Sequence, residues 1–128
     1  MSGTQASGRT PEEKLLSTLG LCAKAGKLVT GTPMVCEAMR SRKPAVLAVL
    51  EAADTSDNTH NKLVSKCTYY QIPRYRLTAD TARLAHAVGK TGAVAAVGVT
   101  DENFCKALAA HLPPRETADD GATPSLNE

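Results

Sequence analysis

Two glycine-bearing turns with basic neighbours are the segments of this 128-residue chain whose residue types could bind a ligand. In the first, residues 24–33, Gly26 and Gly31 bracket a short apolar run that leads into Thr32-Pro33, a typical helix start. The free N–H groups of a helix start bind phosphate or another acceptor. The second turn, residues 88–93, has two glycines that permit close approach to the backbone. Its candidate binding residues are Val88, Gly89, Lys90, Thr91, Gly92 and Ala93, and those of the first turn include Lys24, Lys27 and Thr32.

Motifs for catalysis and for metal binding are lacking in the sequence. Gly89-Lys90-Thr91 matches the end of a phosphate-binding P-loop, but the first glycine of that motif would have to stand at Leu84. The chain has no GxGxxG, GxSxG or HExxH pattern, and its four cysteines are too far apart for a zinc site. We therefore predict a protein that is not an enzyme and has no metal or cofactor. The remaining groups are interpreted as reduced thiols (Cys22, Cys36, Cys67, Cys105), surface or second-layer histidines (His60, His86, His111) and helix-start carboxylates (Glu51, Asp54, Asp57, Asp101, Glu102).

Charge and composition narrow the possible partners. Residues 14–111 contain 13 basic and 7 acidic residues, whereas the whole chain has a net charge of +2, so the two ends together carry −4. A basic body permits contact with a polyanion, although such an excess is equally common on an ordinary soluble surface. Aromatic residues make up only 3% of the chain, which argues against RNA binding by base stacking. The sequence shows no membrane span and no signal peptide, so we expect a cytoplasmic location and no membrane partner.

The elements expected to position the two turns alternate between helix and strand. Residues 1–9 and the acidic tail 113–128 have disorder-prone composition, which leaves one domain over residues 10–112. Apolar runs predict strands over residues 27–30, 45–50, 74–77 and 93–100. Helices are expected from the Thr10 capping box to Gly26, from Thr32 to Pro44, from residues 54–57 to Tyr70, from Thr78 to Gly89, and after Asp101, with Met34, Val35, Ala38 and Met39 inward on the second. This order predicts an α/β fold, a three-layer α/β/α sandwich with a single four-stranded sheet and helices on both faces.

Several segments of the chain resemble one known family. They are residues 19–31 (LGLCAKAGKLVTG), the later positions Val35, Ala38, Arg40 and Ser41, and residues 54–59 (DTSDNT), 84–90 (LAHAVGK) and 97–101 (VGVTD). This pattern is similar to the bacterial YlxQ-like branch of the ribosomal protein family called L7Ae/L30e. The resemblance covers residues 14–108. It implies a three-layer α/β/α fold and binding, on or near the ribosome, to kink-turn RNA, a sharply bent internal loop with tandem sheared G·A pairs.

The resemblance also implies a site. In archaeal and eukaryotic members, the second helix opens with Gly-x-Asn-Glu-x-x-Lys and reads RNA. The matching run here starts at Gly31 and Thr32, with Pro33 for the Asn, Met34 for the Glu and Glu37 for the Lys. Arg40 follows on the next turn. The family's glycine loop, residues 88–93 here, packs against the nucleotide that the kink turns outward.

Two hypotheses follow for the function. The first is a non-enzymatic, monomeric RNA-binding protein that holds structured RNA, such as a kink-turn in ribosomal RNA, between the start of the second helix and the glycine loop. The second is a protein-interaction module on the same fold that has lost kink-turn reading, as Pro33, Met34 and Glu37 suggest. In that case, Met34 and Met39 would supply an adaptable apolar surface.

Overall fold

The computed structural model describes residues 10–116, and these alternate between helix and strand in the predicted order. The expectations for residues 1–9 and 117–128 lie outside the described residues. Each predicted helix and strand has its counterpart, and one further short strand follows the last helix. The elements are α2 (Pro11–Lys24), β1 (Leu28–Thr30), α3 (Thr32–Ser41), β2 (Ala48–Glu51), α4 (Asp57–Tyr70), β3 (Arg74–Arg76), α5 (Thr81–Ala87), β4 (Ala96–Val99), α6 (Glu102–Ala109) and β5 (Arg115–Glu116).

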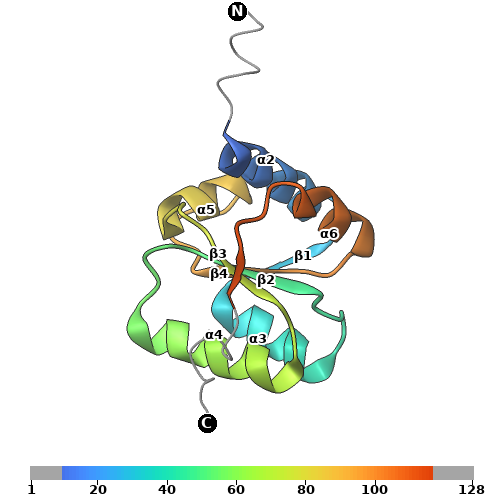
Figure 1. The fold of residues 1–128 in the computed structure, drawn as a ribbon, viewed down its shortest axis with the longest axis vertical. Coiled ribbons are helices and arrows are strands. Elements are labelled where there is room, and N and C mark those ends of the chain that lie inside the picture. The colour runs from blue at the N-terminus through green and yellow to red at the C-terminus, as the bar shows by residue number, and fades with distance from the viewer. Residues whose placement is uncertain (1–9, 117–128) are drawn as a thin grey trace, which may run out of the picture.

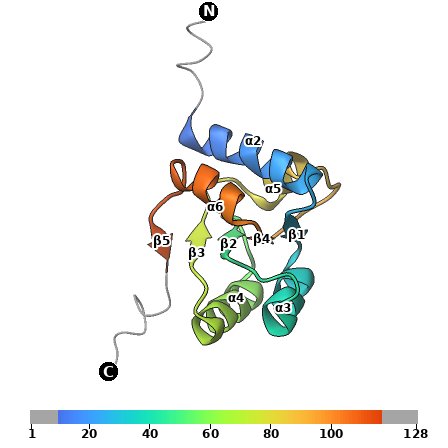
Figure 2. The same ribbon diagram turned by 90° about the vertical axis from the view of Figure 1, so that its right-hand side faces the viewer.

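One mixed sheet separates two layers of helices, as the sequence predicts. The strand order is β1-β4-β2-β3-β5, which can be followed across Figure 2. β2 and β3 are parallel, whereas β4 runs antiparallel to both of its neighbours, β1 and β2. Helices α2, α5 and α6 cover one face of the sheet, and α3 and α4 cover the other (Figure 1). The three-layer α/β/α sandwich is therefore confirmed.

The short strand β5 extends this sheet beyond the four predicted strands. Its register pairs Arg115 with Tyr75 and Glu116 with Arg74, on the outer edge of β3. Residues 115 and 116 fall in the segment that composition assigns to a disordered tail, so the ordered part of the chain reaches past the predicted boundary at residue 112. Backbone groups of an edge strand can pair with any adjacent extended segment, whatever its side chains. Hydropathy carries no signal for such pairing.

The helix starts agree with the sequence except those of α3 and α5. Thr10 and Glu13 form the predicted capping box, and Asp101 caps α6 as expected. Asp80, and not Thr78, caps α5, because the Asp80 carboxylate accepts a hydrogen bond from the Arg83 N–H. Thr78 instead donates its N–H and its hydroxyl to the Glu12 carboxylate at 2.9 and 2.6 Å, which joins α2 to the loop before α5.

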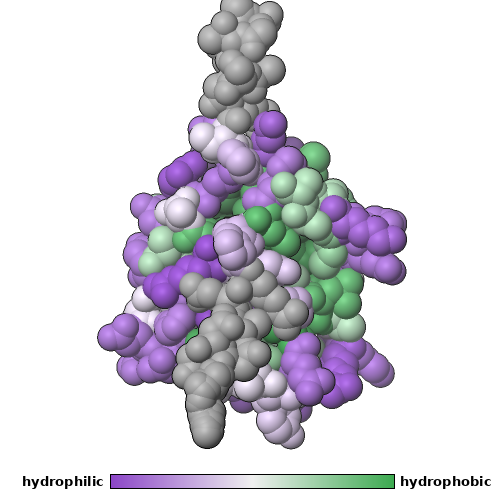
Figure 3. Space-filling view, in the orientation of Figure 1, coloured by the Kyte–Doolittle hydropathy of each residue, from purple (hydrophilic) through white to green (hydrophobic). Residues whose placement is uncertain are grey.

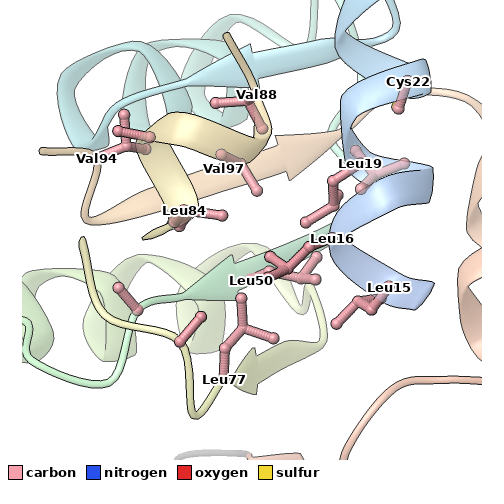
Figure 4. Close-up of a cluster of buried hydrophobic side chains, with 14 of the residues drawn as sticks. Leu15, Leu16, Leu19, Cys22, Leu50, Leu77, Leu84, Val88, Val94 and Val97 are labelled. Atoms are coloured by element: carbon pink, nitrogen blue, oxygen red, sulfur yellow. The ribbon is translucent and has the colours of Figure 1, made fainter. Parts of the chain in front are cut away.

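The core consists of two apolar clusters, one on each face of the sheet. Figure 4 shows the larger cluster, in which Leu15, Leu16 and Leu19 of α2 face Leu50 of β2 and Val97 of β4. The smaller cluster packs α3 and α4 on the other face around Val35, Met39, Val49 and Leu63. Met39 is only 2% exposed, so it cannot contribute to an apolar surface. Fixed packing on both faces of the sheet holds the loops at its ends in place.

Buried thiols give the fold a predicted sensitivity to alkaline pH. Burial raises the pKa of Cys22 to about 11, with help from Asp101 and Cys105, and burial raises that of Cys67 to about 12 although Arg74 opposes it. Above pH 9 the unfolded chain releases thiol protons that the folded chain keeps. The thiol contribution to stability is therefore complete below pH 9 and is lost as the pH rises through these raised values.

Denaturant unfolding of the wild type and of Cys67→Ala across the alkaline range tests this prediction. Other alkaline-titrating groups are shared by both proteins, so the difference between the two curves isolates the Cys67 thiol. We expect the wild type to lose more of its unfolding free energy above pH 9 than the variant loses. Parallel curves for the two proteins would contradict the prediction.

Candidate functional site

Several loops and helix starts meet at one end of the sheet. Because β1, β2 and β3 are mutually parallel and β4 opposes them, the C-terminal ends of those three strands lie beside the N-terminal end of β4. Helices α3, α4 and α5 therefore begin at this end, where the loop of residues 88–95 also enters β4. The topology thus brings together the two turns that the sequence singles out, although they are nearly 60 residues apart.

Three backbone hydrogen bonds fasten the end of the glycine loop to its surroundings. The Val94 N–H donates to Thr81 at the start of α5, and the Ala95 carbonyl accepts from Ala52 after β2. The Ala96 carbonyl accepts from the Gly31 N–H at 2.8 Å, immediately before α3. Ala93 precedes Ala96 by three residues, at most about 10 Å of extended chain. The end of the glycine loop therefore lies beside the start of α3.

The start of α3 is left uncapped by side chains. Gly31, and not Thr32 as predicted, occupies the N-cap position, with φ 94° and ψ 142°, a conformation open essentially to glycine. No side chain accepts from the N–H groups of the first turn. The Thr32 hydroxyl oxygen is buried and has no hydrogen-bond partner among residues 10–116. Pro33, which has no N–H to offer, lies in this first turn without breaking the helix.

The other two helices that start at this end carry side-chain caps. Ser56 accepts from the Thr59 N–H at the start of α4, and Asp80 does the same for α5. Asp54 adds a second acceptor for α5, since its carboxylate binds the Thr81 N–H at 2.7 Å and the Thr81 hydroxyl at 3.2 Å. Among the described helix starts at this end, α3 alone keeps its N–H groups and its positive dipole end available to a ligand.

The glycine loop consists mostly of exposed residues. Lys90 and Thr91 are exposed, and Gly89 and Gly92 have φ values of 77° and 81°. Val88 differs from its neighbours because it is buried in the larger core cluster, where it anchors the loop. The loop therefore combines a fixed base at Val88 with an exposed backbone at its two glycines.

Two further predicted residues, Met34 and Glu37, lie on the exposed side of α3. Met34 is 58% exposed, so the inward orientation predicted for it is wrong. The Glu37 carboxylate binds the exposed Arg40 guanidinium, with its shorter contact at 2.6 Å. This ion pair partly cancels the negative charge that Glu37 places where the family's RNA-reading helix has a cation.

The two lysines of the first turn lie farther from the start of α3. The Lys27 carbonyl accepts from the Thr100 N–H, so Lys27 stands at the opposite end of β1 from Gly31, about 13 Å of strand away. Lys24 ends α2 and, together with Gly89, lines a hollow of about 660 Å³ between α2 and α5. The structure therefore associates Lys24 with the base of the glycine loop, and separates Lys27 from the start of α3.

A buried ionic cluster underlies the site, and sequence reasoning missed it. Glu51, the last residue of β2, is fully buried, and its carboxylate oxygens lie 2.6 Å from the Arg74 guanidinium and 2.8 Å from the His60 imidazole. Glu51 is therefore no helix-start carboxylate, and His60 is its hydrogen-bond partner in the wall of the core. The sequence did carry a signal for this cluster. The charged residue Glu51 ends an apolar strand run, and Arg74 opens the next strand.

The described part of the chain contains neither a membrane-spanning helix nor a metal-binding cluster. None of its helices is both long and apolar enough to span a bilayer. Within residues 10–116, no group of three or more His, Cys, Asp or Glu side chains is arranged to hold a metal ion.

The fold and this site define a small three-layer α/β/α protein with an open helix start beside a glycine loop. The chain belongs to the Ribosomal protein L7Ae/L30e/S12e/Gadd45 family, which its sequence matches over residues 13–109. This confirms the resemblance seen in the sequence.

Named relatives agree with this assignment. The chain is 36% identical over 90 residues to "RNA-binding protein YlxQ" of Bacillus subtilis (strain 168), and 33% identical over 94 residues to the protein of that name from Enterococcus faecium. The matches cover 70% and 73% of this chain, respectively, and 86% of each relative. A solved structure from Bacillus halodurans C, of a protein described as having unknown function, superposes with a TM-score of 0.68 at 37% identity and covers 77% of this chain and 95% of its own. The family and the names describe RNA-binding and ribosomal proteins, so the prediction of a non-enzymatic protein is confirmed.

Proposed function

We propose that this protein binds structured RNA of the kink-turn type, on or near the ribosome, through the start of α3 and the glycine loop of residues 88–93. The observation that carries the proposal is the uncapped start of α3, where a buried Thr32 hydroxyl lacks a partner beside the loop that enters β4. Family membership and the names of the relatives support RNA as the ligand. A monomer in the cytoplasm is the state we expect to act.

Each part of the site has a distinct role in this proposal. The N–H groups of the first turn of α3 donate to RNA acceptors, because the helix dipole favours negative charge at this end. Gly89 and Gly92 let the loop backbone approach a nucleotide that the kink turns outward. Lys24 and Lys90 add positive charge around this contact, and Arg40 offsets the charge of Glu37.

Recognition in this proposal rests on RNA shape more than on base edges. Pro33 and Met34 cannot make the bidentate contacts that an amide and a carboxylate make with bases. Backbone donors and lysines bind phosphate and sugar groups, and these contacts position an RNA without reading its sequence. The bent backbone of the kink is then the feature that the two parts of the site recognise together.

The exposure of Met34 favours a second candidate function, a protein-interaction module. An apolar thioether that is 58% exposed at the mouth of the site suits an adaptable protein contact. Purification after nuclease digestion separates the two candidates. A partner protein that stays bound after the RNA is destroyed would support the second candidate.

Titration against two matched RNAs tests the first candidate. One RNA carries a kink-turn, and the other has its G·A pairs replaced by Watson–Crick pairs. We expect a preference for the kink-turn, with an affinity that falls steeply between low and physiological salt because phosphate contacts release counterions. Equal affinity for both RNAs, or an affinity that salt does not change, would contradict the proposal.

A further inference from the structure

The outer face of α4 consists of hydrogen-bond donors without a carboxylate. After Asp57 in its first turn, the exposed side chains of this helix are Asn58, Asn61, Lys62, Ser65, Lys66, Thr68 and Tyr69. Lysine, asparagine, serine, threonine and tyrosine are the side chains that contact phosphate and sugar in nucleic-acid complexes. By contrast, α2 and α6 expose Glu13 and Glu102 on the opposite layer.

The two lysines of this face are available to a ligand. Lys62 and Lys66 are one helical turn apart, about 6 Å along the axis, so both project from one side of α4. Neither makes an ion pair with a side chain of residues 10–116, whereas Arg40 on the neighbouring helix α3 is bound to Glu37. In Figure 3 the lower part of the molecule, where Figure 1 draws α3 and α4, is mainly hydrophilic.

The position of α4 relates this face to the proposed RNA site. α4 packs beside α3, and both helices begin at the same end of the sheet and run parallel to each other. With 14 residues, α4 extends about 21 Å away from that end. An RNA held at the start of α3 therefore meets the donors of α4 if one of its arms continues along this layer.

We infer that the outer face of α4 is a second RNA contact, which holds a duplex arm of the bound RNA by its phosphates. This inference rests on the proposed function and adds to it the part of the RNA beyond the kink. Lys62 and Lys66 neutralise successive phosphates, and the neighbouring amide and hydroxyl groups donate to phosphate and 2′-hydroxyl oxygens. The contact is independent of sequence, because these groups meet the backbone and not the base edges.

A charge-removing double variant on each layer, measured on two RNAs, tests the inference. Lys62→Ala/Lys66→Ala removes the two α4 charges, and the matched control Lys14→Ala/Lys106→Ala removes two exposed charges from α2 and α6. One RNA is a kink-turn with long flanking stems, and the other has stems shortened to the few pairs needed to hold the kink. Circular dichroism verifies that both variants keep the fold.

On the long-stemmed RNA, we expect the α4 variant to bind at least about tenfold more weakly than the wild type. Its slope of log affinity against log salt should be shallower by about two, one for each lost phosphate contact. The control should match the wild type, the short-stemmed RNA should bind all three proteins alike, and Lys62→Arg/Lys66→Arg should restore binding. Unchanged binding by the α4 variant, an equal loss in the control, or an equal loss on both RNAs would overturn the inference.

Titrating the wild type as well against the control RNA whose G·A pairs are replaced by Watson–Crick pairs distinguishes failure of this inference from failure of the proposed function. A wild type that prefers the kink-turn, with an α4 variant that binds the long-stemmed RNA normally, overturns only the second contact. A wild type without kink-turn preference overturns the proposed function itself, and this inference with it.

Discussion

Replacing Glu51 with alanine is expected to lower the free energy of unfolding by about 3–5 kcal/mol, the typical loss when one partner of a buried ion pair is removed. The Glu51 side chain is fully buried, and its carboxylate binds both the Arg74 guanidinium and the His60 imidazole. Without it, the buried Arg74 loses this counter-charge in a medium where water cannot replace it. Denaturant titration of the wild type and the variant measures the difference.

An exposed glutamate provides the control for this experiment. Glu102 also faces a basic side chain, Lys106, at 3.8 Å, but both side chains are exposed. We expect Glu102→Ala to change stability by less than about 1 kcal/mol, because water screens such pairs. A Glu51→Ala loss no larger than that of Glu102→Ala would show that the buried cluster does not stabilise the fold.

Replacing Gly31 with alanine is expected to weaken RNA binding about 10- to 100-fold while the protein stays folded. The φ of 94° is strained for any residue with a Cβ, and the strain costs on the order of 1–3 kcal/mol. Relaxing it rotates the peptides that begin α3 and misaligns their N–H donors. Loss of one hydrogen bond to a charged group, about 1.5–3 kcal/mol, corresponds to this change in affinity.

Gly26→Ala is the matched control for Gly31→Ala. Gly26 also has a positive φ, 74°, and open space where a Cβ would stand, but it lies before β1, at the other end of that strand from Gly31. We expect both variants to lose stability by similar amounts and only Gly31→Ala to lose RNA affinity. Equal RNA affinities for the two variants would remove the start of α3 from the proposed site.

Most of the architecture could be predicted from the sequence because local signals were strong. Element boundaries are marked by short-range features of the sequence, which include the Thr10 capping box, the apolar run before Glu51 and the Asp101 cap. Strand order and the short strand β5 could not be predicted, since pairing depends on backbone groups that are far apart in the chain. The same limit hid the Thr78 contact with Glu12.

The candidate site could be predicted only in part. The glycines at 31 and 89 mark backbone conformations that few other residues adopt, and the structure confirms the positive φ at both positions. The Glu51 cluster joins residues 9 and 23 positions away, and the charges at the end of one strand and the start of the next do not by themselves indicate which side chains meet. Met34 is outward because it lies about 100° around the helix from Val35, beyond the face that Val35, Ala38 and Met39 bury.

Mapping of backbone amide shifts by NMR during titration with a kink-turn RNA tests the central claim most directly. We predict that the largest shifts fall at the start of α3, on residues 31–35, and in the glycine loop, on residues 88–95, with smaller shifts along the outer face of α4. Residues of α6, on the opposite layer of the sandwich, should shift little. Shifts centred on α6 or β5, with α3 and the loop unchanged, would contradict the proposed site.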